Sequence, residues 1–352
     1  MLKNVVYSRN KEMSMAKTVN EAFNNFLNYE VNIFKSQSDN AKNSRDFLKS
    51  QIHRLSSEGK FLKTVPSYDL NFGSFARKTK IQPLDDIDIM IGLNGFGLQI
   101  ETDKWDNIRL KIKPDCTNKD FINLSDKFSG YWVADTYYLN SNKVKNKLIT
   151  ALNEISQYEK AEIHGRGEAV TLKLLSYSWN FDIVPCFFCD TYYLIPNGYG
   201  NWKKTNPQIE QNRISKLNQK FNGVVLNVIR LIKYWNKHRR MPTMASYVLE
   251  TMVLDYFEQT TSDSIEYVDI RFRKVLNYIG NNILYEVQDS KGIQGNINNS
   301  MTYSEKLKIQ NVAREDYNKS VDAINAETQE KNHKKAISIW GDIFGERFPK
   351  YE

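Results

Sequence analysis

The stretch from Asn71 to Asn94, NFGSFARKTKIQPLDDIDIMIGLN, constrains this chain of 352 residues more than any other segment. Its second half alternates with the period of a β-strand, so that isoleucines lie on one face and carboxylates on the other. The apolar face holds Ile87, Ile89 and Ile91, and the opposite face holds Asp86, Asp88 and Met90. Two carboxylates at alternate positions of a strand lie side by side and can share divalent cations, for which such oxygen ligands favour Mg²⁺ or Mn²⁺. The strand therefore predicts a metal site.

A glycine and a serine come before this strand. Gly73 and Ser74 end an apolar segment in a turn whose backbone N–H groups and hydroxyl can hold phosphate oxygens. Taken singly, a Gly-Ser pair is an ordinary turn, and closely spaced aspartates can mark a solvated strand edge. Together, with eleven residues between Ser74 and Asp86, the two features indicate an enzyme that handles nucleotides.

This arrangement resembles the signature of the DNA polymerase β-like nucleotidyltransferase superfamily. In that signature an apolar residue, Gly and Ser precede a short spacer and an Asp-apolar-Asp-apolar run. The matching residues here are Phe72, Gly73, Ser74, Asp86, Ile87, Asp88 and Ile89. The superfamily also needs a third carboxylate from a neighbouring strand.

One later apolar strand carries a single acid. The segment Leu174 to Phe188, LLSYSWNFDIVPCFF, contains Asp182, which is costly to bury there unless it is paired or bound to a metal. A buried aspartate that accepts backbone hydrogen bonds is the alternative. Because the first pair is present, we expect Asp182 to be the third metal ligand.

Composition narrows the class of protein. A hydrophobic content of 41% indicates a globular protein, and a length of 352 residues is enough for two domains. The net charge of +8 suits nucleoside triphosphates and leaves nucleic acid open as a ligand or activator. Three cysteines are too few for a disulfide framework. The N-terminus has no apolar core of signal-peptide length, and no apolar run approaches a membrane span. We expect a cytoplasmic, soluble protein without membrane contact.

Hydrophobic periodicity predicts two halves. In the first, helices over residues 12–34 and 39–58 brace a sheet whose first two strands are Lys63 to Phe75 and Ile87 to Leu93. Gly, Asn and Pro gather in residues 198–207, and the pattern beyond is wholly helical. We therefore expect an α+β fold with a nucleotidyltransferase core with bracing helices at 1–205 and a helical domain at 206–352.

Longer stretches are similar to the cGAS/DncV-like nucleotidyltransferases (CD-NTases), which make cyclic oligonucleotide signals. These stretches are GSFARKTKIQPLDDIDIM, the Asp182 strand, NWKKTNP, RLIKYWN, ASYVLE and WGDIFGERFP. The resemblance implies a polymerase β-like mixed sheet with flanking helices, packed against an all-helical C-terminal domain that closes the nucleotide cleft. It also implies that Asp86, Asp88 and Asp182 hold two Mg²⁺ ions, for which Mn²⁺ can substitute, and that Gly73 and Ser74 grip the β- and γ-phosphates.

Three residues of the helical half complete the site that the resemblance implies. Lys233 in RLIKYWN and Ser246 in ASYVLE match positions that contact the triphosphate. Ser246 lies in the first turn of a predicted helix, where free N–H groups favour an anion. The alternative interpretation of Lys233 is a solvent-exposed lysine on a helix. Tyr247 can stack on a base, or it can be a core tyrosine.

The resemblance further implies the reaction: nucleoside triphosphates, ATP among them, are joined into a cyclic di- or trinucleotide second messenger in bacterial anti-phage signalling. We expect a monomer, and a nucleic-acid or protein activator stays open. One alternative is a transferase that adds nucleotides to RNA or to a protein, and another is an inactive nucleic-acid-binding scaffold. The basic cluster Lys237 to Arg240 is either a solvated helix end or a contact for the triphosphate or an activator.

Overall fold

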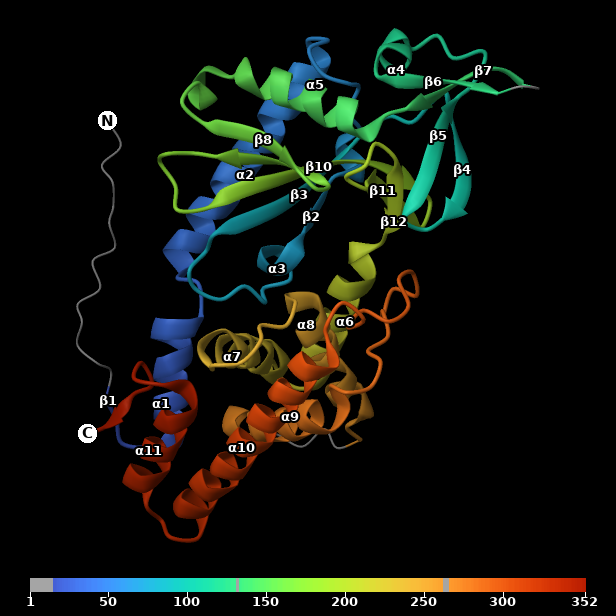
Figure 1. Cartoon of the computed structure of the whole chain (residues 1–352). Coiled ribbons are helices and arrows are strands. Elements are labelled where there is room, and N and C mark those ends of the chain that lie inside the picture. The colour runs from blue at the N-terminus through green and yellow to red at the C-terminus, as the bar shows by residue number, and fades with distance from the viewer. Residues whose placement is uncertain (1–14, 131–132, 262–265) are drawn as a thin grey trace. The chain divides into compact units, whose positions relative to one another are not determined.

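The computed structural model describes residues 15–130, 133–261 and 266–352 and divides into two compact units (Figure 1). The sheet unit consists of Lys35–Arg77 and Leu84–Pro207. The helical unit consists of the remaining described residues, which belong to three separate segments of the chain.

The sheet unit is built on a central pair of parallel strands. β3 (Asp86–Gly92) lies beside β10 (Asn180–Cys189), and their flanking partners, β2 (Leu70–Phe72) and β9 (Ala169–Lys173), are antiparallel to them. The sheet is therefore mixed. Its other strands are β4 (Leu98–Lys104), β5 (Asn107–Ile112), β6 (Ser125–Gly130), β7 (Val133–Leu139), β8 (Glu162–Arg166), β11 (Tyr192–Pro196) and β12 (Trp202–Thr205).

Two helices pack on this sheet, α2 (Lys35–Ser57) and α5 (Ser141–Asn153) (Figure 1). α2 buries one apolar stripe and is tied to the strands by Asp69, whose carboxylate contacts Nε2 of His53 at 2.8 Å and accepts the N–H of Gly92 at 3.0 Å. The short helices α3 (Gly73–Ala76) and α4 (Lys119–Asn123) complete the unit.

The strand predicted over Lys63 to Phe75 is wrong in its extent. Only Leu70–Phe72 is a strand, because Pro66–Tyr68 forms a 3-10 turn and Gly73 begins α3. The predicted polar face of β3 is also shorter than expected. Asp86 and Asp88 are half-buried, whereas Met90 is fully buried in an apolar cluster with residues of β9, β10 and β11.

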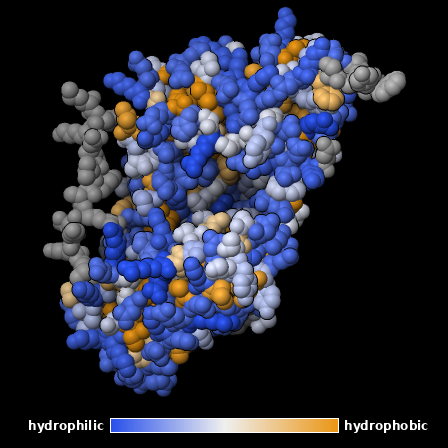
Figure 2. All heavy atoms as spheres, viewed as in Figure 1, coloured by the Kyte–Doolittle hydropathy of each residue, from blue (hydrophilic) through white to orange (hydrophobic). Residues whose placement is uncertain are grey.

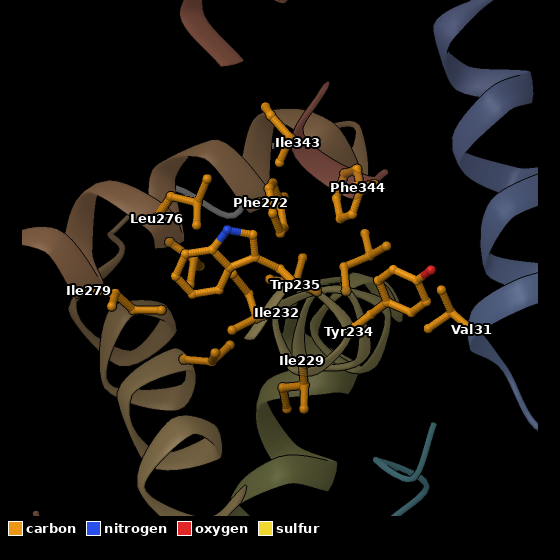
Figure 3. Close-up of a cluster of buried hydrophobic side chains, with 14 of the residues drawn as sticks. Val31, Ile229, Ile232, Tyr234, Trp235, Phe272, Leu276, Ile279, Ile343 and Phe344 are labelled. Carbon is orange, nitrogen blue, oxygen red and sulfur yellow. The ribbon is translucent and has the colours of Figure 1, made fainter. Parts of the chain in front are cut away.

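The helical unit surrounds α7 (Val224–His238). Figure 3 shows side chains of α7, among them Trp235, packed against apolar residues of neighbouring helices. Trp235 is fully buried, and its indole N–H donates to Asp316 at 2.7 Å. The other helices are α1 (Val19–Phe26), α6 (Pro207–Lys220), α8 (Ser246–Gln259), α9 (Val268–Asn282), α10 (Tyr303–Thr328) and α11 (His333–Phe344), with the strand pair β1 (Met15–Ala16) and β13 (Lys350–Tyr351).

The predicted bracing role of the first helix is wrong, since α1 belongs to the helical unit. Phe23 on α1 meets Trp340 edge to face, with ring centroids 4.9 Å apart. An amphipathic stripe shows which face of a helix is buried but not which partner buries it. The predicted domain boundary between residues 205 and 206 therefore assigned this helix to the sheet domain. The predicted helix also began at residue 12, and residues 12–14 lie outside the described range.

A second segment also joins the helical unit. Lys78–Pro83 comes soon after α3 in the chain. Ile81 is buried in the helical core, where it forms a β-bridge with Asn32.

In the described part of the chain, no helix combines the length and apolar character needed to cross a membrane. The face seen in Figure 2 is mostly hydrophilic, with apolar residues in small groups.

Candidate active site

The three predicted carboxylates converge on one face of the central strand pair. β3 and β10 are parallel, and their register places Asp182 opposite Asp88. Asp86 lies two residues before Asp88 and therefore on the same face. One oxygen of each carboxylate lies within 4.8 Å of the other two, and all three side chains are half-buried.

A threonine on the next strand holds the third carboxylate. Thr171 on β9 is paired with Asp182, and its hydroxyl donates to Oδ1 of Asp182 at 2.6 Å. This leaves Oδ2 of Asp182 as the oxygen without that bond. Thr171 was not predicted, because the alternation of Ala169–Lys173 does not reveal which residue of another strand lies opposite.

The glycine of the turn lies against the second carboxylate. Phe72 pairs with Asp88 at the end of β2, so the chain turns at Gly73 beside that side chain. Gly73 has a φ of +73°, which favours glycine, and a Cβ there would lie 1.7 Å from Oδ2 of Asp88. Only glycine permits this approach. Ser74 follows in the first turn of α3, and its contact with phosphate stays a prediction.

The donor set fits a hard divalent cation. Three carboxylates from adjacent strands supply only oxygen ligands, the set that Mg²⁺ and Mn²⁺ prefer over softer metals. Thr171 orients one ligand, as outer residues commonly do at metal sites. The carboxylate of Asp88 occupies the place where a Cβ of residue 73 would lie. The residues present therefore fit a site for a divalent cation.

Lys233 of the helical unit is buried rather than solvated. Its side chain is 8% exposed, and Nζ lies 3.0 Å from Oε1 of Glu250. The same oxygen accepts the hydroxyl of Thr79 at 3.0 Å. The interpretation of Lys233 as a solvated helix lysine is therefore wrong, and its contact with a triphosphate stays a prediction.

Ser246 and Tyr247 begin α8. Ser246 is exposed at the first position of this helix, where backbone N–H groups lack intrahelical acceptors. Tyr247 is half-buried, its hydroxyl donates to Asp289, and Nζ of Lys291 lies 4.1 Å from the centre of its ring. A purely apolar core position does not describe this tyrosine.

The basic cluster Lys237 to Arg240, at the end of α7, is partly engaged in ion pairs. Nε of Arg239 lies 2.8 Å from Oδ2 of Asp316, and a second nitrogen lies 3.5 Å from Glu315. Lys237 and Arg240 are exposed. A solvated helix end therefore describes only part of the cluster.

Comparison with known proteins places the chain among nucleotide synthases. No protein-family model matches it. The chain is 39% identical over 352 residues to a probable cyclic nucleotide synthase of Bacillus cereus, an alignment that covers 96% of this chain and all of that protein. It is 25% identical over 210 residues to a cyclic AMP-AMP-AMP synthase of Acinetobacter, covering 57% of this chain and 58% of that protein.

Solved structures share the fold. An Escherichia coli CdnC with ATP has a TM-score of 0.66 at 16% identity and covers 94% of this chain and 98% of its own. A Vibrio cholerae di-nucleotide cyclase, DncV, in a complex that includes ATP and GTP has a TM-score of 0.67 at 9% identity, with coverage of 95% and 97%. The predicted α+β fold, a polymerase β-like mixed sheet with a helical C-terminal region, is confirmed.

Proposed function

The chain belongs to the cGAS/DncV-like nucleotidyltransferases (CD-NTases), and from this premise we propose that it joins nucleoside triphosphates into a cyclic di- or trinucleotide with release of pyrophosphate. ATP is one of the substrates in this proposal. The observation that carries it is the convergence of Asp86, Asp88 and Asp182 within 4.8 Å on neighbouring strands, beside the turn at Gly73.

The three carboxylates would hold two Mg²⁺ ions, and Mn²⁺ can substitute. Such ions stabilise the entering and leaving oxygens of a phosphoryl transfer. In the reaction a 2′- or 3′-hydroxyl oxygen loses its proton to solvent and bonds to an α-phosphorus. The bond from that phosphorus to the oxygen bridging the α- and β-phosphates breaks, and pyrophosphate leaves with the electron pair of that bond. The chain itself supplies rigid placement: the strand register sets Asp182 opposite Asp88, and Thr171 orients Asp182.

Four further residues would bind the triphosphate. Gly73 and Ser74 supply N–H groups and a hydroxyl for the β- and γ-phosphates. Ser246 supports the same role because it opens a helix of 14 residues, whose N-terminus attracts anions. Lys233 would add a positive charge, and its ion pair with Glu250 supports a fixed position for that charge.

Product analysis tests the proposal. The full chain is incubated with the four nucleoside triphosphates and Mg²⁺, and the products are identified by mass spectrometry and linkage-specific nucleases. We expect a cyclic product without any added acceptor, and we expect Asp86→Asn with Asp88→Asn to lower pyrophosphate release at least about 10³-fold. Normal turnover by this double variant would overturn the metal assignment.

Other outcomes identify the alternatives. Transfer only to added RNA or protein would indicate a nucleotide-adding transferase. Salt-dependent RNA binding together with no Mg²⁺-dependent binding of triphosphate would indicate an inactive scaffold. Mg²⁺-dependent triphosphate binding without turnover would direct the search to an activator.

The biological setting rests on the family resemblance. We place the protein in the cytoplasm as a monomer whose product is a second messenger in defence against phage. Cells that carry the wild-type chain with its neighbouring genes should resist phage better than cells with the double variant, and equal resistance would contradict this setting.

A further inference from the structure

Three charged side chains and the tyrosine at the start of α8 form a polar network. The members come from three parts of the helical unit: Tyr247 on α8, Glu210 in the first turn of α6, and Asp289 and Lys291 in the loop after α9. Nζ of Lys291 lies 2.8 Å from Oε1 of Glu210 and 3.9 Å from Oδ1 of Asp289. The side chains of Lys291, Glu210 and Asp289 are at most 9% exposed, so these ion pairs lie in the interior of the helical unit.

Asp289 organises the loop around its carboxylate. Oδ1 accepts the N–H of Lys291 at 3.1 Å, while Oδ2 accepts the N–H groups of Ile293 at 3.1 Å and Gln294 at 2.9 Å. Burial raises the pKa of this carboxyl, but the hydrogen bonds from Tyr247, Gln294 and Lys291 outweigh burial and leave the pKa below its ordinary value.

These contacts leave the tyrosine ring little freedom. The hydroxyl is fixed because it donates to Asp289, and burial, followed by this hydrogen bond, raises the pKa of Tyr247. One ring face carries Nζ of Lys291 at 4.1 Å from its centre. A planar ligand can therefore stack only on the opposite face, at an orientation set by the loop rather than by α8 alone.

We propose that Asp289 and Lys291 are positioning residues that hold Tyr247 as a one-sided stacking platform for a purine nucleotide. The proposal rests on the proposed function and on the contact of Tyr247 with a base that the family resemblance implies. A ring held at the tip and on one face cannot turn to follow a smaller base, so stacking favours the base with the larger overlap. Purines therefore gain more stacking free energy on the fixed ring of Tyr247 than pyrimidines do.

Nucleotide binding by matched variants tests this role. Affinities of the full chain for non-hydrolysable ATP and CTP analogues are measured by calorimetry with Mg²⁺. Tyr247→Phe keeps the ring but loses its tie to Asp289, and Lys291→Met keeps the length of the side chain but loses its cation. We expect each to weaken ATP-analogue binding about tenfold and CTP-analogue binding by less.

Two further variants serve as controls. Lys291→Arg keeps the cation and should restore most of the ATP-analogue affinity. Lys216→Met removes an exposed charge from α6 and should change neither affinity. The thermal transition of each variant reports whether the helical unit stays folded.

Each result decides between the two proposals. An unchanged ratio of ATP- to CTP-analogue affinity in Tyr247→Phe and Lys291→Met would overturn the positioning role while the proposed function stands. Equal loss for both analogues, without rescue by arginine, would also overturn it, because a merely structural defect does not discriminate between bases. Failure of the wild-type chain to bind either analogue would remove the proposed function and this inference together.

Discussion

At the residue scale, the site depends on how closely backbone and side chain approach. Gly73 brings its Cα against Asp88, and Thr171 directs Asp182 through a hydrogen bond of 2.6 Å. Neither residue carries one of the three carboxylates, yet each contacts one of them. Small changes at these two positions should therefore alter the chemistry more than the stability.

Gly73 and Gly59 allow a matched test of this approach. Both have a φ of +73°, but a Cβ at Gly59 would meet nothing within 4 Å, whereas one at Gly73 would collide with Asp88. Alanine at either position should cost about 1–2 kcal/mol of unfolding free energy through backbone strain. Only Gly73→Ala should lower turnover, by about 100-fold, because Asp88 must move. Similar turnover in the two variants, measured as pyrophosphate release per folded molecule, would contradict this account.

Thr171 should affect metal affinity. Thr171→Val keeps the shape of the side chain but removes its hydrogen bond to Asp182, so the Mg²⁺ concentration for half-maximal activity should rise by about 10- to 100-fold. Thr171→Ser retains the hydroxyl and should stay close to wild type. An unchanged Mg²⁺ dependence in the valine variant would show that Asp182 needs no such support.

At the element scale, α8 links separate segments of the helical unit. Glu250, on the second turn, joins Lys233 of α7 to Thr79 of the segment Lys78–Pro83, while Tyr247 is held by the loop after α9. Glu250 is 2% exposed, and a buried carboxylate is tolerated only when it is paired in this way. The start of α8 is thus held by long-range contacts as well as by its own helical bonds.

A buried aspartate in the first turn of α9, Asp269, should make the unfolding free energy depend on pH. Burial, with a smaller contribution from Glu327, raises the pKa of Asp269 to about 6. The folded state then keeps this proton up to about pH 6, whereas an unfolded aspartate releases it near pH 4, so the unfolding free energy falls as pH rises between these values. Asp269→Asn removes this cost and should add about 3 kcal/mol at pH 7 and almost nothing below pH 4.

Chemical denaturation from pH 4 to pH 8 measures this difference. Asp322→Asn, an exposed position on α10, serves as the control and should match wild type throughout. A lower stability of Asp269→Asn than of wild type at pH 7 would mean that the helix N-terminus stabilises the charged form enough to offset its burial.

At the scale of the whole molecule, the chain passes four times between the two units, after Phe34, Arg77, Pro83 and Pro207. The helical unit therefore depends on residues from the first tenth of the chain. Phe23 and Phe26 of α1 contact Phe344 of α11, with ring centroids 5.7 Å and 5.1 Å apart. Cutting the chain near residue 206 would remove these partners from the helical core.

Hydrogen exchange can test whether α1 folds and opens together with the helical unit. Phe23→Ala should cost about 3–5 kcal/mol and speed amide exchange in α1, α9 and α11 more than in β3 and β10. Ile52→Ala, at a buried position on α2 of the sheet unit, should give the opposite pattern. Equal acceleration in both units by Phe23→Ala would show that the molecule opens as a single cooperative block.

The sequence by itself determined the features that local pattern encodes. The alternation around Asp86 and Asp88 predicted their shared face, the isolated acid in an apolar strand predicted Asp182, and the composition change at residues 198–207 predicted where the helical segments begin. Strand period and turn chemistry are short-range properties, so a single chain displays them directly.

Only the tertiary structure decided which distant residues meet. It placed Thr171 on Asp182, paired Lys233 with Glu250, assembled Asp289 and Lys291 around Tyr247, and assigned α1 to the helical core. An apolar stripe or a polar side chain shows that a partner is needed but does not identify it. The partner follows from strand register and helix packing, which depend on the whole chain at once.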